Sequence, residues 1–147
     1  MNREIKFRAK RIDNNKWAYG GLIQADDYCI IDQQNELYVE EDYHFRGDTH
    51  FFRLSGVMCD ENTIGQFTGL HDADGKEIYE GDIILEDKDP TIMEIVFRDG
   101  IFFASIGNTH GENRFMNCAL RVILDRRKTH IIGNVHDNPS LLKGGEE

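Results

Sequence analysis

The chain has 147 residues, of which 39% are hydrophobic and 10% aromatic, enough to build the core of one ordinary domain or two very small ones. Its charged fraction of 30% is typical of globular proteins and argues against disorder, while its net charge of −10 argues against broad affinity for nucleic acid, which rests on neutralising phosphates. Because no apolar run approaches the about 20 residues that cross a bilayer, and the chain starts with charged residues, we expect a cytoplasmic protein with no membrane partner.

The first expected element is a β-hairpin. Residues 4–11, EIKFRAKR, alternate apolar and basic side chains with the period of a half-buried strand. The polar residues 13–16 form a turn, and residues 17–23 return as a second strand. In this interpretation the cations face water and form a basic surface for a partner, which comprises Lys6, Arg8, Lys10 and Arg11.

More short strands are expected in an N-terminal β region that spans residues 1–58. Residues 28–32 and 36–39 are two apolar runs separated by the polar sequence QQN. Residues 43–58 contain several aromatic side chains and predict one or two further strands.

The strand pattern is stronger between residues 59 and 137. Runs rich in β-branched and aromatic residues, each bounded by glycine, aspartate or proline, cover residues 63–70, 76–79, 81–86, 92–97, 101–106 and 129–135. Strands with such short, even spacing are typical of antiparallel sandwiches and barrels. Residues 115–124 fit both a strand and a helical face, and we favour the strand. In the last segment, 138–147, we expect a short helix with Asn138 as its cap and Pro139 in its first position.

The most distinctive stretch is residues 65–84, GQFTGLHDADGKEIYEGDII. Asp72 and Asp74 suggest a calcium loop, but the next glycine comes too early for one. The preferred interpretation is a hairpin in which a left-handed glycine closes the turn, and the Asp-Gly pair at 99–100 predicts a second such turn. The expected structural turn residues are Gly75, Gly81, Asp82 and Gly100.

Alternation within these runs also predicts the core. Its expected members are Ile64, Phe67, Leu70, Ile78, Ile83, Leu85, Ile95, Phe97, Phe102, Ile131 and Val135. In the run 81–86, we expect Ile83 and Leu85 on one face and Ile84 and Glu86 on the other.

The three cysteines, Cys29, Cys59 and Cys118, lie far apart in the sequence. No two of them have the close spacing of zinc ligands, and an odd number does not complete a disulfide framework. We therefore expect buried free thiols in a reducing compartment.

Two histidine pairs have even spacings, His44 with His50 and His130 with His136. Within uninterrupted strands each pair would share one face, which allows a metal site. Solvated or hydrogen-bonded histidines are the simpler interpretation, and we predict neither a metal nor a cofactor.

Three segments resemble the YopX family of bacteriophage and prophage proteins: REIKFRAKRIDNNKWAYG, TIGQFTGLHDADGKEIYEGDII and IIGNVHDNPSLL. They occur in the order of the family and span nearly the whole chain. The resemblance implies an N-terminal β region followed by an SH3-like barrel, and the run YEGDIILE is itself similar to small barrels of that type. It implies no activity that can be transferred to any residue.

The predicted function is that of a phage or prophage accessory protein, a non-enzymatic binding or structural module that acts through a β-barrel surface on a host or phage protein. One alternative is nucleic-acid binding through the basic residues in 1–17 and 121–128, or mimicry of DNA by the acidic surface. A further alternative is a metal-dependent hydrolase that uses Asp72, Asp74, Glu80 and Asp82.

The distribution of charge also suggests an oligomer. The acidic excess lies between residues 24 and 99, whereas strand 4–11 is basic. This strand is therefore expected to dock either on the acidic face of a neighbouring copy or within its own chain.

Overall fold

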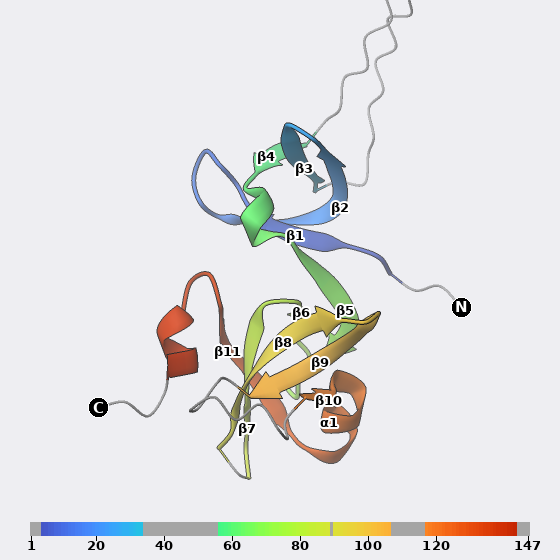
Figure 1. Ribbon diagram of the computed structural model, residues 1–147, viewed down its shortest axis with the longest axis vertical. Helices are drawn as coiled ribbons and strands as arrows, with labels where there is room; N and C mark the ends of the chain where they lie inside the picture. Colours follow the sequence, from blue (N-terminus) through green and yellow to red (C-terminus); the bar gives the residue numbers. More distant parts are fainter. Residues whose placement is uncertain (1–3, 34–55, 89, 107–116, 144–147) are drawn as a thin grey trace, which may run out of the picture. The chain divides into compact units, whose positions relative to one another are not determined.

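The computed structural model describes residues 4–33, 56–88, 90–106 and 117–143 (Figure 1). These residues fall into two compact units, one formed by Ile5–Ile64 and the other beginning at Gly65. Both are mainly antiparallel β structure, as predicted. No helix in the described part of the chain is long and apolar enough to cross a membrane.

The N-terminal unit is a β-meander, drawn in blue to green in Figure 1. Its elements are β1 (Phe7–Lys10), β2 (Trp17–Ala25), β3 (Tyr28–Asp32), β4 (Val57–Cys59) and the 3-10 helix η1 (Glu61–Thr63). Strand β2 pairs with β1 and β3, and β3 pairs with β4, so neighbours in sequence are neighbours in the sheet. Small and compact side chains from all the strands form its core: Ala9, Ala18, Cys29, Ile31 and Cys59.

The predicted N-terminal hairpin is confirmed, but the expectation that all its cations face water is wrong. Arg8 is only 6% exposed, and its guanidinium lies 4.6 Å from the centre of the Trp17 ring. In the β1–β2 register Arg8 opposes Tyr19 and Lys10 opposes Trp17, so the indole is the diagonal cross-strand neighbour of Arg8. Large aromatic side chains reach such diagonal positions, and here the ring covers the cation.

The C-terminal unit contains a strand in each of the six runs predicted at 63–70, 76–79, 81–86, 92–97, 101–106 and 129–135. Its elements are β5 (Gly65–His71), β6 (Glu77–Tyr79), β7 (Asp82–Glu86), β8 (Ile92–Arg98), β9 (Ile101–Ile106), β10 (Asn117–Ala119), α1 (Leu120–Arg126), β11 (Thr129–Asn134) and the 3-10 helix η2 (Pro139–Lys143). Within the unit, β5 pairs with β6, and an antiparallel sheet has the order β10-β9-β8-β7-β11. Among the described residues these are open strand orders and no closed barrel is found, so the SH3-like barrel stays a prediction.

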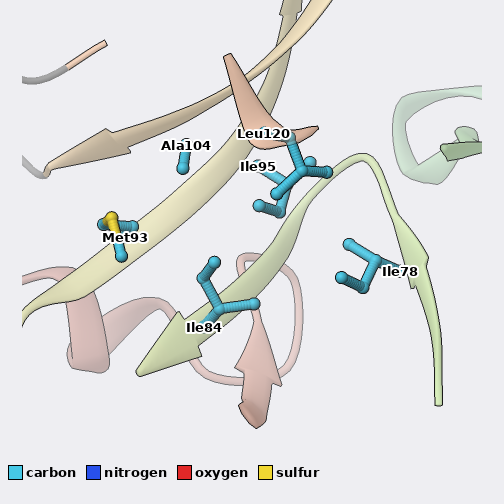
Figure 2. Close-up of a cluster of buried hydrophobic side chains, with 6 residues drawn as sticks. All are labelled: Ile78, Ile84, Met93, Ile95, Ala104 and Leu120. Carbon is cyan, nitrogen blue, oxygen red and sulfur yellow. The ribbon is translucent and has the colours of Figure 1, made fainter. Parts of the chain in front are cut away.

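The core of the C-terminal unit is a cluster of buried aliphatic side chains (Figure 2). It draws on β6 to β9 and on the first residue of α1, and its members are Ile78, Ile84, Met93, Ile95, Ala104 and Leu120. Because the members come from segments far apart in sequence, this cluster ties the β5–β6 hairpin, the sheet and α1 into one packed body.

Strand β7 is buried on both faces, which corrects the predicted one-sided pattern. Ile83 and Ile84 point to opposite faces, yet both are 0% exposed, whereas Leu85 is partly exposed. The prediction of Phe97 as a core residue is also wrong: it is 47% exposed near the end of β8, where its ring packs on that of Phe102.

The other predicted core residues are buried or partly buried. Phe67, Ile78, Ile83 and Ile95 are fully inside. Partial burial is found for the remaining ones, Ile64, Leu70, Phe102, Ile131 and Val135.

The turn predictions are confirmed at both hairpins. Gly75 has φ of 80° and Gly100 has φ of 79°, in the left-handed region that disfavours residues with a Cβ. Asp99 has φ of 50°, so the Asp99-Gly100 pair has the two positive φ angles of the predicted tight hairpin turn. Gly81 also has a positive φ, and its N–H donates to Ile95 O across the unit.

Three local predictions have other outcomes. Residues 117–119 form β10, but 120–126 form α1, so the preference for a strand through 124 is wrong. The C-terminal helix begins at Pro139 as predicted, while the Asn138 Oδ1 atom accepts a hydrogen bond from Asn134 N. The strand expected at 36–39 lies outside the described residues. One or two strands were expected in 43–58; residues 43–55 of this segment also lie outside the described residues, and β4 begins in the described part at Val57.

Candidate functional site

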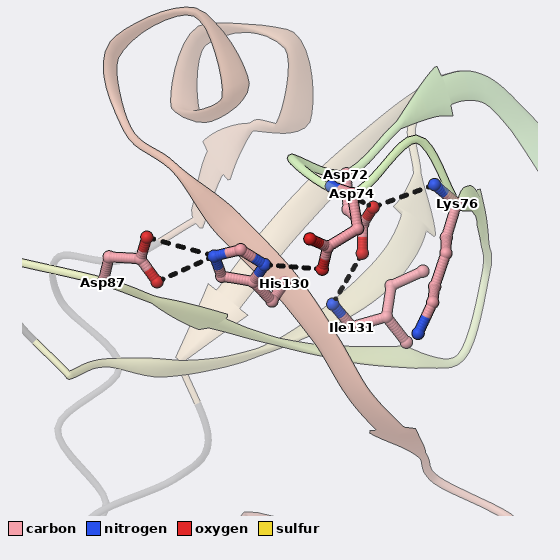
Figure 3. A network of polar contacts seen from close by, with 6 residues as sticks. All are labelled: Asp72, Asp74, Lys76, Asp87, His130 and Ile131. Carbon is pink, nitrogen blue, oxygen red and sulfur yellow. Dashed lines mark hydrogen bonds and ion pairs between the residues drawn. The ribbon is translucent and has the colours of Figure 1, made fainter.

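The acidic stretch singled out in the sequence is a hydrogen-bonded structural network in the C-terminal unit (Figure 3). The buried Asp72 carboxylate accepts hydrogen bonds from Asp74 N and Lys76 N, both at 2.9 Å, and from Ile131 N at 3.0 Å. Burial alone would raise the pKa of Asp72, but the backbone donors together outweigh it and lower that pKa. Asp72 therefore closes its own hairpin turn and attaches this turn to β11.

His130 forms the second part of this network, between two carboxylates. Its Nδ1 lies 2.7 Å from Asp74 Oδ2, and its Nε2 lies 2.9 Å from Asp87 Oδ1. A neutral imidazole has one N–H, whereas the protonated ring donates from both nitrogens. The hydrogen bonds to Asp74 and Asp87 thus raise the pKa of His130. These partners are 56 and 43 positions away in sequence, and no local pattern predicts them.

We expect the His130 pair of contacts to stabilise the protein in acid and to weaken in alkali. Because the folded-state pKa is raised, this stabilisation is complete below the ordinary histidine pKa of about 6.5 and is lost as pH rises through the folded value. Thermal unfolding of wild type and His130→Gln, measured across this range, should differ most at the acidic end. An NMR titration of the ring protons should give a pKa above the ordinary value.

The matched variant is Asp74→Asn with Asp87→Asn, which preserves the size of both partners and removes their charge. The pKa of His130 should then fall back towards its ordinary value. If the ring titrated identically in this variant and in wild type, the two carboxylates would not be the cause of the shift.

The remaining acids of the hydrolase alternative are Glu80, which follows β6, and Asp82, which begins β7. Asp82 is 2% exposed, and its Oδ2 accepts a hydrogen bond from Tyr79 N at 2.8 Å, which confirms its role in the turn before β7. Burial raises the pKa of Glu80. Within the described ranges, no group of three or more histidine, cysteine or acidic side chains is arranged to bind a metal ion.

His130 and His136 do not share a strand face in the way their spacing suggested. A register shift interrupts β11 between Ile131 and Gly133, and His136 lies beyond the end of this strand. Its backbone N–H donates to Asn134 Oδ1 in the turn that follows. His44 and His50 are outside the described residues.

The candidate functional site is a hollow of about 460 Å³ in the N-terminal unit, which we call the acidic groove. The groove is of a size that takes a small ligand or side chains of a bound peptide. Its lining combines acidic with apolar side chains: Asp26, Asp27, Tyr28, Met58, Asp60 and Glu61.

Two local structures place the acids of the groove. Asp26 and Asp27 form the tight turn between β2 and β3, where Ala25 pairs with Tyr28. Asp60 caps η1 by accepting a hydrogen bond from Asn62 N at 3.0 Å, and Glu61 is exposed in the first turn of η1. Aspartate is a favoured cap because its carboxylate satisfies the otherwise unpaired N–H groups there.

Arg11 also lines the groove, and its charge is already neutralised within the unit. Arg11 Nη2 lies 2.6 Å from Asp13 Oδ2, and its Nε donates to Asp13 Oδ1. This hydrogen-bonded pair raises the pKa of Arg11 and lowers the pKa of Asp13. Asp26, Asp27 and Glu61 are exposed, so the groove presents a net negative surface.

Of the predicted basic surface, the structure places Arg8 under Trp17 and Arg11 beside Asp13. The edge of β1 at Lys10 is covered as well. Lys10 N donates to Thr63 Oγ1, and Lys10 O accepts from Asp60 N, both at 2.8 Å. The backbone of the basic strand at Lys10 is therefore hydrogen-bonded to η1 and its cap.

Two cysteines lie at the acidic groove, a feature that sequence spacing did not reveal. Cys29 on β3 and Cys59 on β4 are paired residues in the sheet, and both line the hollow. Burial raises the pKa of both thiols. Both are free cysteines, and Cys59 Sγ donates a weak hydrogen bond to Val57 O.

A second hollow, of about 370 Å³, lies in the C-terminal unit. Its lining is more apolar and includes Leu70, Phe97, Ile101 and Phe102, with Arg121 among the polar residues. This lining does not indicate one partner chemistry over another.

By its fold this is a small, mainly β protein made of two antiparallel units, and the first unit carries the acidic groove. The chain belongs to the YopX family: the family model described as YopX protein matches residues 6–143, which confirms the resemblance in the sequence. Among solved structures, the chain is similar to "Crystal structure of protein EF1440 from Enterococcus faecalis", with a TM-score of 0.59 and 25% identity over 96% of this chain and 99% of that one. No functionally curated protein matches the chain.

Proposed function

We propose that this protein is a non-enzymatic binding module of a bacteriophage or prophage, which acts in the cytoplasm of the host by accepting a basic segment of a partner protein in the acidic groove. The observation that supports this proposal is the combination of a hollow of about 460 Å³ with acidic and apolar side chains around it. An SH3-like arrangement of the C-terminal unit is part of the same proposal.

A basic protein segment fits the groove in two respects. Asp26, Asp27 and Glu61 attract cations, and this attraction is strongest at low salt. Tyr28 and Met58 are 38% and 48% exposed, and they supply apolar surface for the aliphatic stems of arginine and lysine. The Tyr28 ring also offers a face for a cation.

Nucleic-acid binding is supported less well by the placement of the basic residues. Arg121 pairs with Asp125, and Arg127 pairs with Glu86 at 2.8 Å. Arg126 and Lys128 are exposed at the end of α1, but a short cluster of this kind gives few phosphate contacts.

The test uses the full-length protein and two synthetic peptides of equal length, one rich in arginine and leucine and one with glutamate in place of each arginine. Calorimetry at low salt should detect binding of the basic peptide and no binding of the acidic one. The affinity for the basic peptide should fall as the salt concentration approaches about 0.15 M. Replacing Asp26→Asn and Asp27→Asn together should weaken binding by about twofold to thirtyfold, since exposed ion pairs contribute about 0.2–1 kcal/mol each.

The control is the pair Asp99→Asn and Asp125→Asn, which removes the same charge from the C-terminal unit. Equal weakening in both double variants, or no binding of the basic peptide, would contradict the proposal. Light scattering of the protein alone tests whether the basic segment comes from a second copy of this chain. A second copy would be the partner if the protein associates at low salt and this association is lost in both variants. The first is Asp26→Asn with Asp27→Asn, and the second replaces Lys6 and Lys10 by glutamate. Binding of duplex DNA in place of the basic peptide would favour the alternative.

A further inference from the structure

Cys29 and Cys59 face each other across two paired strands of the N-terminal unit. Strands β3 and β4 are antiparallel, and their register places Cys29 opposite Cys59, with Ile30 opposite Met58 beside them. Directly opposed residues project their side chains from the same face of a sheet. Cys29 and Cys59 are accordingly 2% and 3% exposed and belong to the same buried cluster.

This placement meets the geometric requirement for a disulfide. Opposed residues in an antiparallel pair have Cα atoms about 4.5–5.5 Å apart. Disulfides join cysteines whose Cα atoms are about 4.4–6.8 Å apart. The two strands can therefore be linked without a change of register.

We propose that Cys29 and Cys59 are an oxidation site at which the folded protein forms an intramolecular disulfide with a small-molecule disulfide as the oxidant. The thiolate of one cysteine attacks the oxidant and releases one small thiol, which leaves a mixed disulfide on the protein. The second cysteine, after losing its proton to solvent, attacks the protein sulfur of that intermediate and releases the second small thiol. The two protein thiols are oxidised, and the oxidant is reduced to two thiols.

The acidic groove gives the oxidant its approach, because both cysteines line this hollow. Burial nevertheless raises the pKa of both thiols, so the reactive thiolate is scarce at neutral pH. The reaction should be slow at neutral pH and faster in mild alkali. The disulfide should therefore form only during prolonged exposure to an oxidant.

This inference does not depend on the function proposed above, since disulfide formation is measured without any binding partner. The disulfide would join β3 to β4 at the position where Cys29 and Cys59 line the acidic groove. Loss of disulfide formation and loss of peptide binding are separate results, and neither implies the other.

The experiment incubates the full-length protein with oxidised glutathione at mildly alkaline pH without denaturant. Non-reducing peptide mapping should show a Cys29–Cys59 link, and the number of free thiols should fall from three to one. Trp17 is the single tryptophan and lies in the N-terminal unit, so its fluorescence follows the unfolding of this unit. The unfolding midpoint should rise on oxidation by at least about 5 °C and return on reduction.

The background variant Cys118→Ser removes the third thiol and should form the same link at the same rate. Cys59→Ser should stop at a mixed disulfide on Cys29 or remain unmodified. The proposal is overturned if the link is absent from the folded protein, if it forms only when denaturant is present, or if Cys118 is the partner of either residue. A link that lowers the midpoint would also contradict it, because the native register would then not accommodate the bond.

Discussion

Replacing Ile84 by alanine is expected to lower the free energy of unfolding of the C-terminal unit by about 2–5 kcal/mol. Ile84 is 0% exposed and lies in the cluster that joins β6, β7, β8, β9 and α1 (Figure 2). Removing its side chain loses the transfer free energy of the deleted methyl and methylene groups and leaves a cavity that the surrounding strands fill only in part. Urea unfolding followed by far-ultraviolet circular dichroism measures the change.

Two variants serve as references for the loss of stability in Ile84→Ala. Ile84→Val removes less volume and should cost about 0.5–1.5 kcal/mol. Ile101→Ala makes the same chemical change as Ile84→Ala at a position that is 49% exposed, and it should cost well under half as much. Similar losses at positions 84 and 101 would show that the cluster is not the packed core of this unit.

Replacing Asp72 by alanine is expected to cost about 2–4 kcal/mol, because it leaves three partly buried backbone donors without their acceptor. The carboxylate accepts hydrogen bonds from Asp74 N, Lys76 N and Ile131 N, and the residue is 7% exposed (Figure 3). The substitution releases the hairpin turn and its attachment to β11 together. Asp72→Asn retains one acceptor oxygen and should fall between alanine and wild type.

The same residue predicts a loss of stability in acid. The folded-state pKa of Asp72 is lowered, so its stabilisation is present above the ordinary carboxyl pKa of about 3.9 and is lost as pH falls through the folded value. Wild type should lose more stability than Asp72→Asn in this range. The control is Asp74→Ala, an exposed acid of the same turn, which should cost about 1 kcal/mol or less at neutral pH. An equal loss for Asp72→Ala and Asp74→Ala would contradict the role of the buried carboxylate.

Much of the fold was predictable because its signals are local. The runs between 63 and 135 alternate or carry β-branched residues, and each became a strand. Gly75 and Gly100 were predictable because a tight hairpin turn needs a positive φ that glycine adopts at little cost. Residues 120–126 were not predictable in this way, because their apolar spacing fits both a strand and a helix. In the folded protein they form α1, and Leu120 packs in the core cluster.

Less of the candidate site was predictable. The acids of the groove were visible in the sequence as part of an acidic excess, but neither the hollow nor its apolar lining was. The stretch that contains Asp72 was predicted to be a hairpin turn. The hydrogen bond from Ile131 N to Asp72 was not predictable, because the two residues are 59 positions apart in the sequence. The basic strand was recognised, but the burial of Arg8 under Trp17 depends on a diagonal contact between strands.

Local periodicity and turn chemistry were thus sufficient for the strands, the hairpins and the family, because each depends on residues close together in the chain. Contacts between distant segments required the folded protein. The alternation of a strand specifies which side chains share a face, but not which strand lies beside it, in which register, or whether both faces are covered. The opposition of Cys29 to Cys59, the carboxylates on either side of His130 and the burial of both Ile83 and Ile84 follow from pairing and packing, and these were decided when the chain folded.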